Sequence, residues 1–306
     1  MNEKIKAELQ ISNLVDVSKP RTILADAKRF YKSSYPESDF RMVEKGFLLA
    51  KRLFDGRFPG YLACAVEYHT YSHSVSVFAA VSRLLDGCEL SGLAIGPERA
   101  AEALLAALLH DVGYLREEGD ETGSGAQYTK VHVARSAAFA RRHAPAFGLS
   151  EAAAERVARM ILATEVSGEL DYIAFSDSGE RLGAEILAAA DLLGQMSDRA
   201  YLEKLLFLFY EFKEAGIGGY DTAFDVLRKT AAFYDSTKAR LDGMLGRVSG
   251  KARRHFSERC GEDRDLYREA IGRQMDYLGS ILADGQGNFR GKLKRMDLAA
   301  IESRRA

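Results

Sequence analysis

The stretch AAEALLAALLHD, residues 100–111, decides the fold class of this chain. Its apolar residues recur at the spacing of a helix and fill nearly all of its length. The stretch AEILAAADLLGQM, residues 184–196, repeats the pattern, and a broad apolar stripe runs through residues 66–85. Alternating runs of Val, Ile, Thr and Tyr, which would indicate strands, are nearly absent. The sequence therefore predicts an all-α protein, a bundle of many helices with a cleft for the site described below.

Most of the chain can be divided into helices separated by short breaks. The five prolines fall between helical stretches, and residues 113–127 and 167–178 are rich in Gly, Ser, Asp and Glu, which predicts two surface loops. The predicted helices span residues 2–15, 20–33, 39–55, 62–86, 97–110, 129–143, 150–163, 179–197, 199–215, 219–246 and 262–284.

Length and composition indicate one folded unit. The 306 residues, 47% of them hydrophobic, suffice for a sizeable core. We expect N-terminal helices (residues 1–56) to pack on a core (57–215). C-terminal helices (216–285) would complete the same domain, and a tail (286–306) would follow it.

Charge and cysteine content narrow the classes of partner. Lys and Arg number 43 against 44 Asp and Glu, a net charge of −1, so no basic field would attract nucleic acid or an anionic membrane. Cys64, Cys88 and Cys260 are widely spaced and odd in number, which excludes a disulfide framework and favours a reducing compartment. With no apolar signal segment near the N-terminus, we expect a cytoplasmic protein. Whether it forms a homodimer is left open.

Isolated polar residues on apolar helices point to a metal site. His69 and His73 lie four residues apart on the predicted helix 62–86, about 40° apart around its axis, so both imidazoles could face one site. His110 and Asp111 end one strongly apolar helix, and Asp191 lies in the middle of another. A lone carboxylate is costly in such surroundings, and a bound cation would remove that cost.

Two imidazoles and two carboxylates form a mixed nitrogen and oxygen ligand set. Such a set suits a divalent transition metal (Mn, Fe, Co, Ni or Zn) with positions left for water and substrate. Each of these residues alone is better explained as structural. Their combination on successive apolar helices favours a metal centre.

The pattern His73, His110-Asp111, Asp191 resembles the signature of the HD superfamily of metal-dependent phosphohydrolases, and its class I cyclic-nucleotide phosphodiesterase branch most of all. The YHTYSH stretch at residues 68–73 is similar to the Y-H-N-x-x-H motif of that branch. Residues 161–165, ILATE, are similar to its I-L-A-T-D segment. His132 stands where many HD proteins carry a further histidine. The resemblance covers residues 57–195.

The resemblance implies roles for individual residues. His73, His110, Asp111 and Asp191 would bind the first metal, and Asp111 would also bridge to a second. His69 would be the general acid that protonates the leaving oxygen. His132, and with it Glu165, would lie on the side of the second metal or of a phosphate oxygen. Glu165 or Glu67 could pair with His69.

Departures from the family pattern also carry predictions. The histidine that follows HD in H-D-x-x-H is absent, as are the HH pair before the last Asp and a convincing equivalent of the glutamine that binds the purine. We therefore expect one firmly bound metal, and a second ion such as Mg²⁺ bound weakly if at all.

The expected function is hydrolysis of a small phosphomonoester or phosphodiester, a nucleotide by preference, by a metal-activated water. Two alternatives remain: a phosphodiesterase for cyclic nucleotides or dinucleotides, and a metal- or nucleotide-binding regulatory module with weak turnover. Outside this site, we expect His143 at a surface helix end, His255 in solvent, and the aromatic residues 207–212 in the core.

Overall fold

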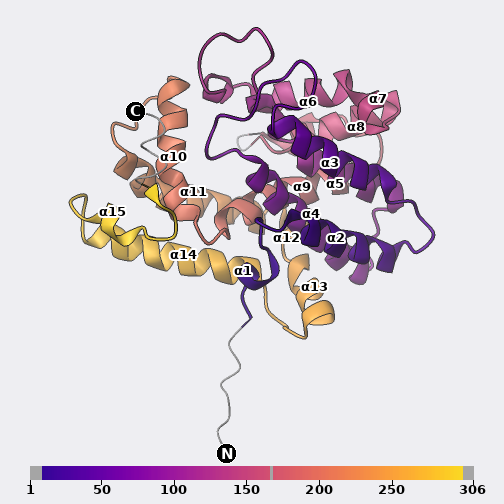
Figure 1. Ribbon diagram of the computed structural model, residues 1–306. Coiled ribbons are helices and arrows are strands. Elements are labelled where there is room, and N and C mark those ends of the chain that lie inside the picture. Colours follow the sequence, from indigo (N-terminus) through magenta and orange to yellow (C-terminus); the bar gives the residue numbers. More distant parts are fainter. Residues whose placement is uncertain (1–8, 166–167, 299–306) are drawn as a thin grey trace, which may run out of the picture.

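The computed structural model describes residues 9–165 and 168–298, and within these ranges all regular structure is helical apart from one isolated bridge between Tyr61 and Glu117 (Figure 1). The all-α prediction is confirmed. The α-helices are α1 (Ile11–Leu14), α2 (Pro20–Ser34), α3 (Arg41–Phe54), α4 (Tyr71–Leu90), α5 (Pro97–Leu109), α6 (His132–Arg142), α7 (Ala144–Phe147), α8 (Glu151–Leu162), α9 (Ser178–Met196), α10 (Tyr201–Glu214), α11 (Ala223–Asp242), α12 (Gly246–Ser249), α13 (Lys251–Cys260), α14 (Leu266–Ala283) and α15 (Phe289–Lys292). Short 3-10 turns are η1 (Val112–Tyr114), η2 (Ala126–Tyr128) and η3 (Leu170–Tyr172).

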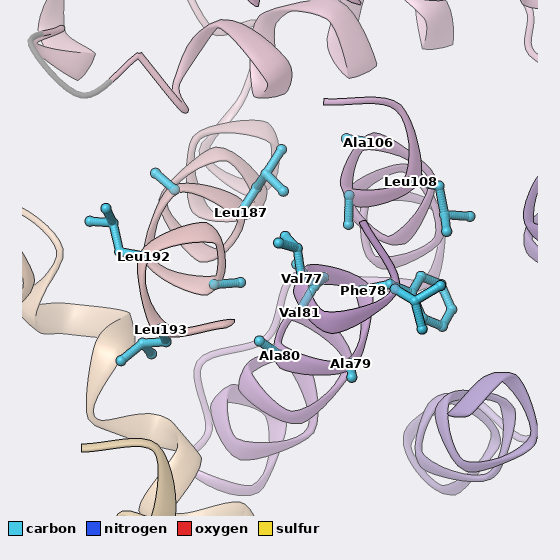
Figure 2. Close-up of a cluster of buried hydrophobic side chains, with 14 of the residues drawn as sticks. Val77, Phe78, Ala79, Ala80, Val81, Ala106, Leu108, Leu187, Leu192 and Leu193 are labelled. Atoms are coloured by element: carbon cyan, nitrogen blue, oxygen red, sulfur yellow. The ribbon is translucent and has the colours of Figure 1, made fainter. Parts of the chain in front are cut away.

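Helix α4 is the centre of the molecule. All of its residues from His73 to Cys88 are buried, and it packs against α2, α5, α9 and α13. A helix covered on every side needs small or apolar residues all round, which explains the run of Ala, Val, Ser and Leu in this segment. Figure 2 shows the side chains that α4, α5 and α9 contribute to this core. Helix α9 comes especially close, because a Cβ added to Gly194 would lie 3.3 Å from the Ser76 backbone.

The remaining helices flank this centre. In Figure 1, α10 and α11 lie on one side of α4 and α9, and α6, α7 and α8 lie on the other. Helix α6 packs on α8, α10 packs on α11, and α14 packs on α9. The long apolar helices α4, α5 and α9 therefore meet in the interior, and the loops at their ends face the flanking helices.

The start of α4 differs from its prediction. The predicted helix began at residue 62, but α4 begins at Tyr71, and residues 61–70 form an irregular segment. Tertiary partners take the hydrogen bonds that a helix would have made. The Cys64 N–H donates to the Phe54 carbonyl at 2.9 Å, and the Tyr68 N–H donates to the Glu211 carboxylate at 2.7 Å. Once these N–H groups are satisfied elsewhere, helix propensity no longer decides the conformation.

The two ends of the chain also differ from their predictions. The predicted helix 219–246 is shorter, since α11 ends at Asp242, and α13 was not predicted. Of the predicted helix 2–15, residues 2–8 lie outside the described range, and α1 covers only four residues. The C-terminal segment is less exposed than expected, because the side chains of Phe289 and Leu293 are buried against the core.

Among the residues described, no helix is both long enough and apolar enough to cross a membrane.

Candidate metal centre

Four side chains from three helices meet at one point, which we call the His/Asp cluster: His73, His110, Asp111 and Asp191. His73 lies in the first turn of α4, His110 and Asp111 follow the end of α5, and Asp191 lies on α9. Because α4 packs on both α5 and α9, the apolar faces of these helices bring the isolated polar residues together.

Three members of the cluster, His73, His110 and Asp111, have ligand atoms that all lie within 4.8 Å of one another, as a shared metal requires. The Nε2 atoms of His73 and His110 are 3.2 Å apart. Asp111 Oδ2 lies 3.2 Å from His73 Nε2 and 3.1 Å from His110 Nε2. Asp191 Oδ1 lies 3.3 Å from His73 Nε2 and 3.6 Å from His110 Nε2. The four side chains that the sequence singled out as metal ligands are therefore brought together.

Two observations indicate that a cation fits this point. Asp111 Oδ2 is buried and has no hydrogen-bond partner, a costly condition for a carboxylate oxygen unless a cation is bound there. The His110 Nδ1–H donates to the Ala107 carbonyl at 2.9 Å, so its Nε2 faces the cluster. This backbone hydrogen bond is the usual way in which a metal-binding histidine is oriented.

The electrostatics of the cluster favour positive charge. Burial alone would raise the pKa of Asp111, but the neighbouring imidazoles hold it well below its ordinary value. Burial alone would likewise lower the pKa of His110, but the charge of Asp111 raises it well above its ordinary value. The two carboxylates thus stabilise a positive charge where the four side chains meet.

His69 lies beside the cluster but not on α4, contrary to the prediction. It precedes Thr70, the N-cap of α4, so the expected four-residue spacing on one helix does not apply. Its ring centroid is 6.0 Å from that of His73. The His69 Nδ1–H donates to Glu211 Oε2 at 2.6 Å. The irregular segment, and not a helical face, therefore places this imidazole at the site.

Glu211 of α10 is the partner of His69, in place of the Glu165 or Glu67 suggested by the sequence. Its Oε1 accepts the backbone N–H groups of Glu67 at 3.1 Å and Tyr68 at 2.7 Å, and its Oε2 accepts His69 Nδ1–H. The carboxylate is buried, with 1% exposure. One side chain thus fixes both the imidazole and the chain segment that carries it.

Tyr114 of η1 packs against two imidazoles. Its ring stacks on His69 with centroids 4.2 Å apart and on His132 with centroids 4.5 Å apart. His132, the first residue of α6, donates from Nδ1 to the Thr129 carbonyl at 2.7 Å and places Nε2 3.7 Å from Asp111 Oδ1. Burial lowers the pKa of His132, with the charge of Asp111 opposing, so its Nε2 is a neutral acceptor. Asp111 therefore presents its two oxygens to different imidazoles.

A cavity of about 230 Å³ opens from the cluster. His69, His132 and Asp191 line its inner end. Glu165 lines it as well, at an exposed position after α8, where its backbone carbonyl accepts an N–H of Arg240 at 3.2 Å. The predicted cleft is therefore present. Six of the seven predicted site residues border it, and the seventh, His110, is fully enclosed.

Some site residues were missed by the sequence analysis. Glu211 carries the same signal as Asp191, a carboxylate on an apolar helix, but α10 holds three glutamates. One of the others, Glu203, is equally buried and accepts the backbone N–H of Arg295 at 3.0 Å, far along the sequence from the site. Tyr114 carries no sequence signal of its own, since one aromatic residue after HD is equally consistent with packing.

Predictions for residues elsewhere were partly wrong. His255 is buried, with 1% exposure, because its Nδ1–H donates to Asp86 at 2.7 Å. His143 is half-buried among aromatic rings, and its Nε2 lies 3.1 Å from the Tyr61 hydroxyl. Of the aromatic residues 207–212, Phe207 is in the core but Phe212 lines the cavity.

Fold and site define a helical protein with a buried His/Asp cluster beside a cavity. The chain belongs to the Npun_R2479-like family, whose model matches residues 61–241, more than half of the chain. The matched range contains every residue of the site described above and excludes α2, α3, α13 and α14. No curated protein and no solved structure matches the chain.

Proposed function

We propose that this protein is a metal-dependent phosphohydrolase of the HD type, acting on a phosphomonoester or phosphodiester. The observation that carries the proposal is the pairing of two units at one cavity. The His/Asp cluster offers two imidazole nitrogens and two carboxylates to an ion, and the His69–Glu211 pair beside it is separate from that ligand set. Hydrolysis of a phosphoester needs both an activated water and a proton donor. An ion held by the His/Asp cluster would activate the water, and the His69–Glu211 pair would donate the proton.

His73, His110, Asp111 and Asp191 would hold the ion. When bound, a divalent transition metal supplies a hydroxide-like nucleophile near neutral pH and offsets phosphoryl charge. Mn, Fe, Co, Ni and Zn all suit this mixed ligand set. Asp111 and His132, whose Oδ1 and Nε2 atoms are 3.7 Å apart, would hold a second, weaker ion such as Mg²⁺.

His69 is suited to donate a proton to the leaving oxygen. Its Nδ1–H is bound to the Glu211 carboxylate, which orients the ring and leaves Nε2 to face a substrate. Stacking on Tyr114 fixes the plane of the ring. The substrate phosphoryl group would lie between this ring and the cluster, and the organic group would extend into the cavity.

The test combines metal analysis with a panel of phosphoesters. We expect the purified chain to retain about one transition metal and to hydrolyse at least one phosphoester when Mn²⁺, Ni²⁺ or Co²⁺ is added. Two tightly retained metals would make His132 a true ligand. Metal binding without hydrolysis of any ester, nucleotides and cyclic nucleotides included, would overturn the enzymatic proposal in favour of a regulatory binding module.

We also propose a cytoplasmic location, because the state of the cysteines agrees with a reducing compartment. Cys64, Cys88 and Cys260 are all free thiols.

A further inference from the structure

One wall of the cavity is apolar. We call it the α10–α11 wall: Leu205, Leu208 and Phe212 of α10, Tyr220 of the following loop, and Val226 and Phe233 of α11. The rings of Phe212 and Tyr220 are 5.0 Å apart and tilted by 43°. A group that enters the cavity from the cluster meets hydrocarbon and aromatic surface on this side.

Three of the hydroxyl groups that line the cavity are already engaged as donors. Thr230 Oγ1 donates to the Val226 carbonyl at 2.8 Å, and Thr164 Oγ1 donates to the Ile161 carbonyl at 2.8 Å. The Tyr68 hydroxyl donates to Gln195 Oε1 at 2.9 Å. A site that discriminates nucleobases places free donors and acceptors along the base edge, and these three hydroxyls have no spare proton for that purpose.

Positive charge is sparse in the cavity. Lys229 is the only Lys or Arg among the described residues that line it. Its ammonium group donates to the Gly219 carbonyl and lies 4.3 Å from the centre of the Tyr220 ring. A di- or triphosphate chain needs several cations or backbone donors for its additional charges. The cavity offers charge compensation for one phosphoryl group, at the cluster.

We infer that the substrate carries a single phosphoryl group on a small, mainly apolar aryl or alkyl group, which the α10–α11 wall recognises. This inference rests on the proposed phosphohydrolase function and narrows its substrate class away from the nucleotide that the sequence favours. The volume of about 230 Å³ lies below the range that drug-sized ligands occupy, which agrees with a small organic group. Phe212 and Leu208 are the residues expected to determine specificity.

The experiment compares esters that carry one phosphoryl group and differ in the organic part, together with one triphosphate. Initial rates would be measured on the full chain loaded with Mn²⁺, using phenyl phosphate, hexyl phosphate, glycerol phosphate, adenosine monophosphate and adenosine triphosphate. We expect kcat/KM for phenyl or hexyl phosphate to exceed that for each of the other three by about tenfold or more. Equal or faster hydrolysis of glycerol phosphate or either nucleotide would overturn the inference and leave the phosphohydrolase proposal standing.

Substitutions on α10 test whether the α10–α11 wall causes this preference for apolar esters. Phe212→Ala should reduce the preference for phenyl over glycerol phosphate by about tenfold. Phe209→Ala is the matched control, since Phe209 lies on the same helix, is partly buried, and does not line the cavity. An unchanged preference in Phe212→Ala, with the melting temperature retained, would exclude the wall as the recognition surface.

A binding measurement separates failure of this inference from failure of the proposed function. Phenylphosphonate cannot be hydrolysed at its P–C bond, so its binding to the Mn²⁺-loaded protein can be measured by calorimetry whether or not the protein is an enzyme. Binding that is weakened about tenfold by Phe212→Ala, together with no hydrolysis of any ester, would overturn the function and retain the recognition surface. Absence of both hydrolysis and binding would overturn both.

Discussion

Helix α4 carries two buried clusters of histidine and aspartate that differ in what surrounds them. Near its start, His73 joins the His/Asp cluster. Thirteen residues later, about 20 Å along the helix, Asp86 contacts His255 and Arg259 of α13, which we call the Asp86 cluster. Both aspartates, Asp111 and Asp86, are at most 3% exposed. Burial alone therefore does not distinguish a candidate metal site from a structural ion pair.

The distinction lies in how the carboxylate oxygens are satisfied. Asp86 accepts from His255 Nδ1 at 2.7 Å and from Arg259 Nη2 at 2.6 Å, so both of its oxygens are used and its charge is neutralised. Asp111 Oδ2 has no hydrogen bond. The crevice beside Asp86 measures about 10 Å³, room for about one water, against about 230 Å³ at the other cluster. An unsatisfied oxygen beside open space indicates a ligand site, and a saturated carboxylate in a closed core indicates a structural one.

Removing a carboxylate from each cluster gives the largest expected contrast. Asp111→Ala should abolish both metal retention and activity on every ester, because it removes a ligand of the metal. Asp86→Ala should leave the metal content unchanged and lower stability by about 3 kcal/mol, since Arg259 and His255 lose their buried partner. Elemental analysis and denaturant unfolding measure both. Loss of metal in Asp86→Ala would contradict the separation of the two clusters.

A second contrast uses one histidine from each region. His69→Ala should lower kcat by about 10²–10⁴-fold on esters with poor leaving groups and much less on p-nitrophenyl esters, while metal content stays constant. His255→Ala should leave kcat unchanged and lower the melting temperature. If His69→Ala also loses the metal, His69 belongs to the ligand set.

The pairing of His69 with Glu211 has a smaller expected effect. Glu211→Gln keeps an acceptor for the backbone N–H groups of Glu67 and Tyr68 but removes the charge beside His69. We expect kcat to fall by about tenfold on esters with poor leaving groups, since the imidazole loses the carboxylate that orients it as proton donor. An equal fall on p-nitrophenyl esters, whose leaving oxygen scarcely needs a proton, would assign Glu211 a purely structural role.

The smallest effect concerns pH and the Asp86 cluster. Burial lowers the pKa of His255, and the hydrogen bond with Asp86 offsets only part of that shift. A histidine whose pKa is lower in the folded state binds fewer protons there than when unfolded, so stability falls as the pH drops below about 6.5. The decrease in melting temperature between pH 7.5 and pH 5.5 should be about 2 °C smaller in His255→Gln than in the original chain. An equal decrease would show that His255 contributes nothing to the pH dependence.

The metal-ligand set could be predicted from the sequence more accurately than the conformation of the neighbouring segment that carries His69. His73, His110, Asp111 and Asp191 lie on helices whose apolar periodicity is strong, so their faces follow from the helix geometry. His69 lies in a segment whose conformation depends on Glu211, more than a hundred residues away in sequence. No local pattern contains that contact. The burial of His255 has the same origin, since its partner Asp86 lies on a helix far from α13 in sequence.

Under the proposed function, helix α10 would connect substrate recognition to proton transfer. It carries Phe212 of the α10–α11 wall and, one residue earlier, the Glu211 carboxylate that binds His69, the proposed proton donor. A substrate whose organic group displaces α10 would also displace His69 relative to the bound phosphoryl group. Misplacement by about 1 Å can cost a hundredfold in rate. Poorly fitting esters would therefore be rejected at the proton-transfer step as well as at binding. Such an ester would show both a lower kcat and a higher KM.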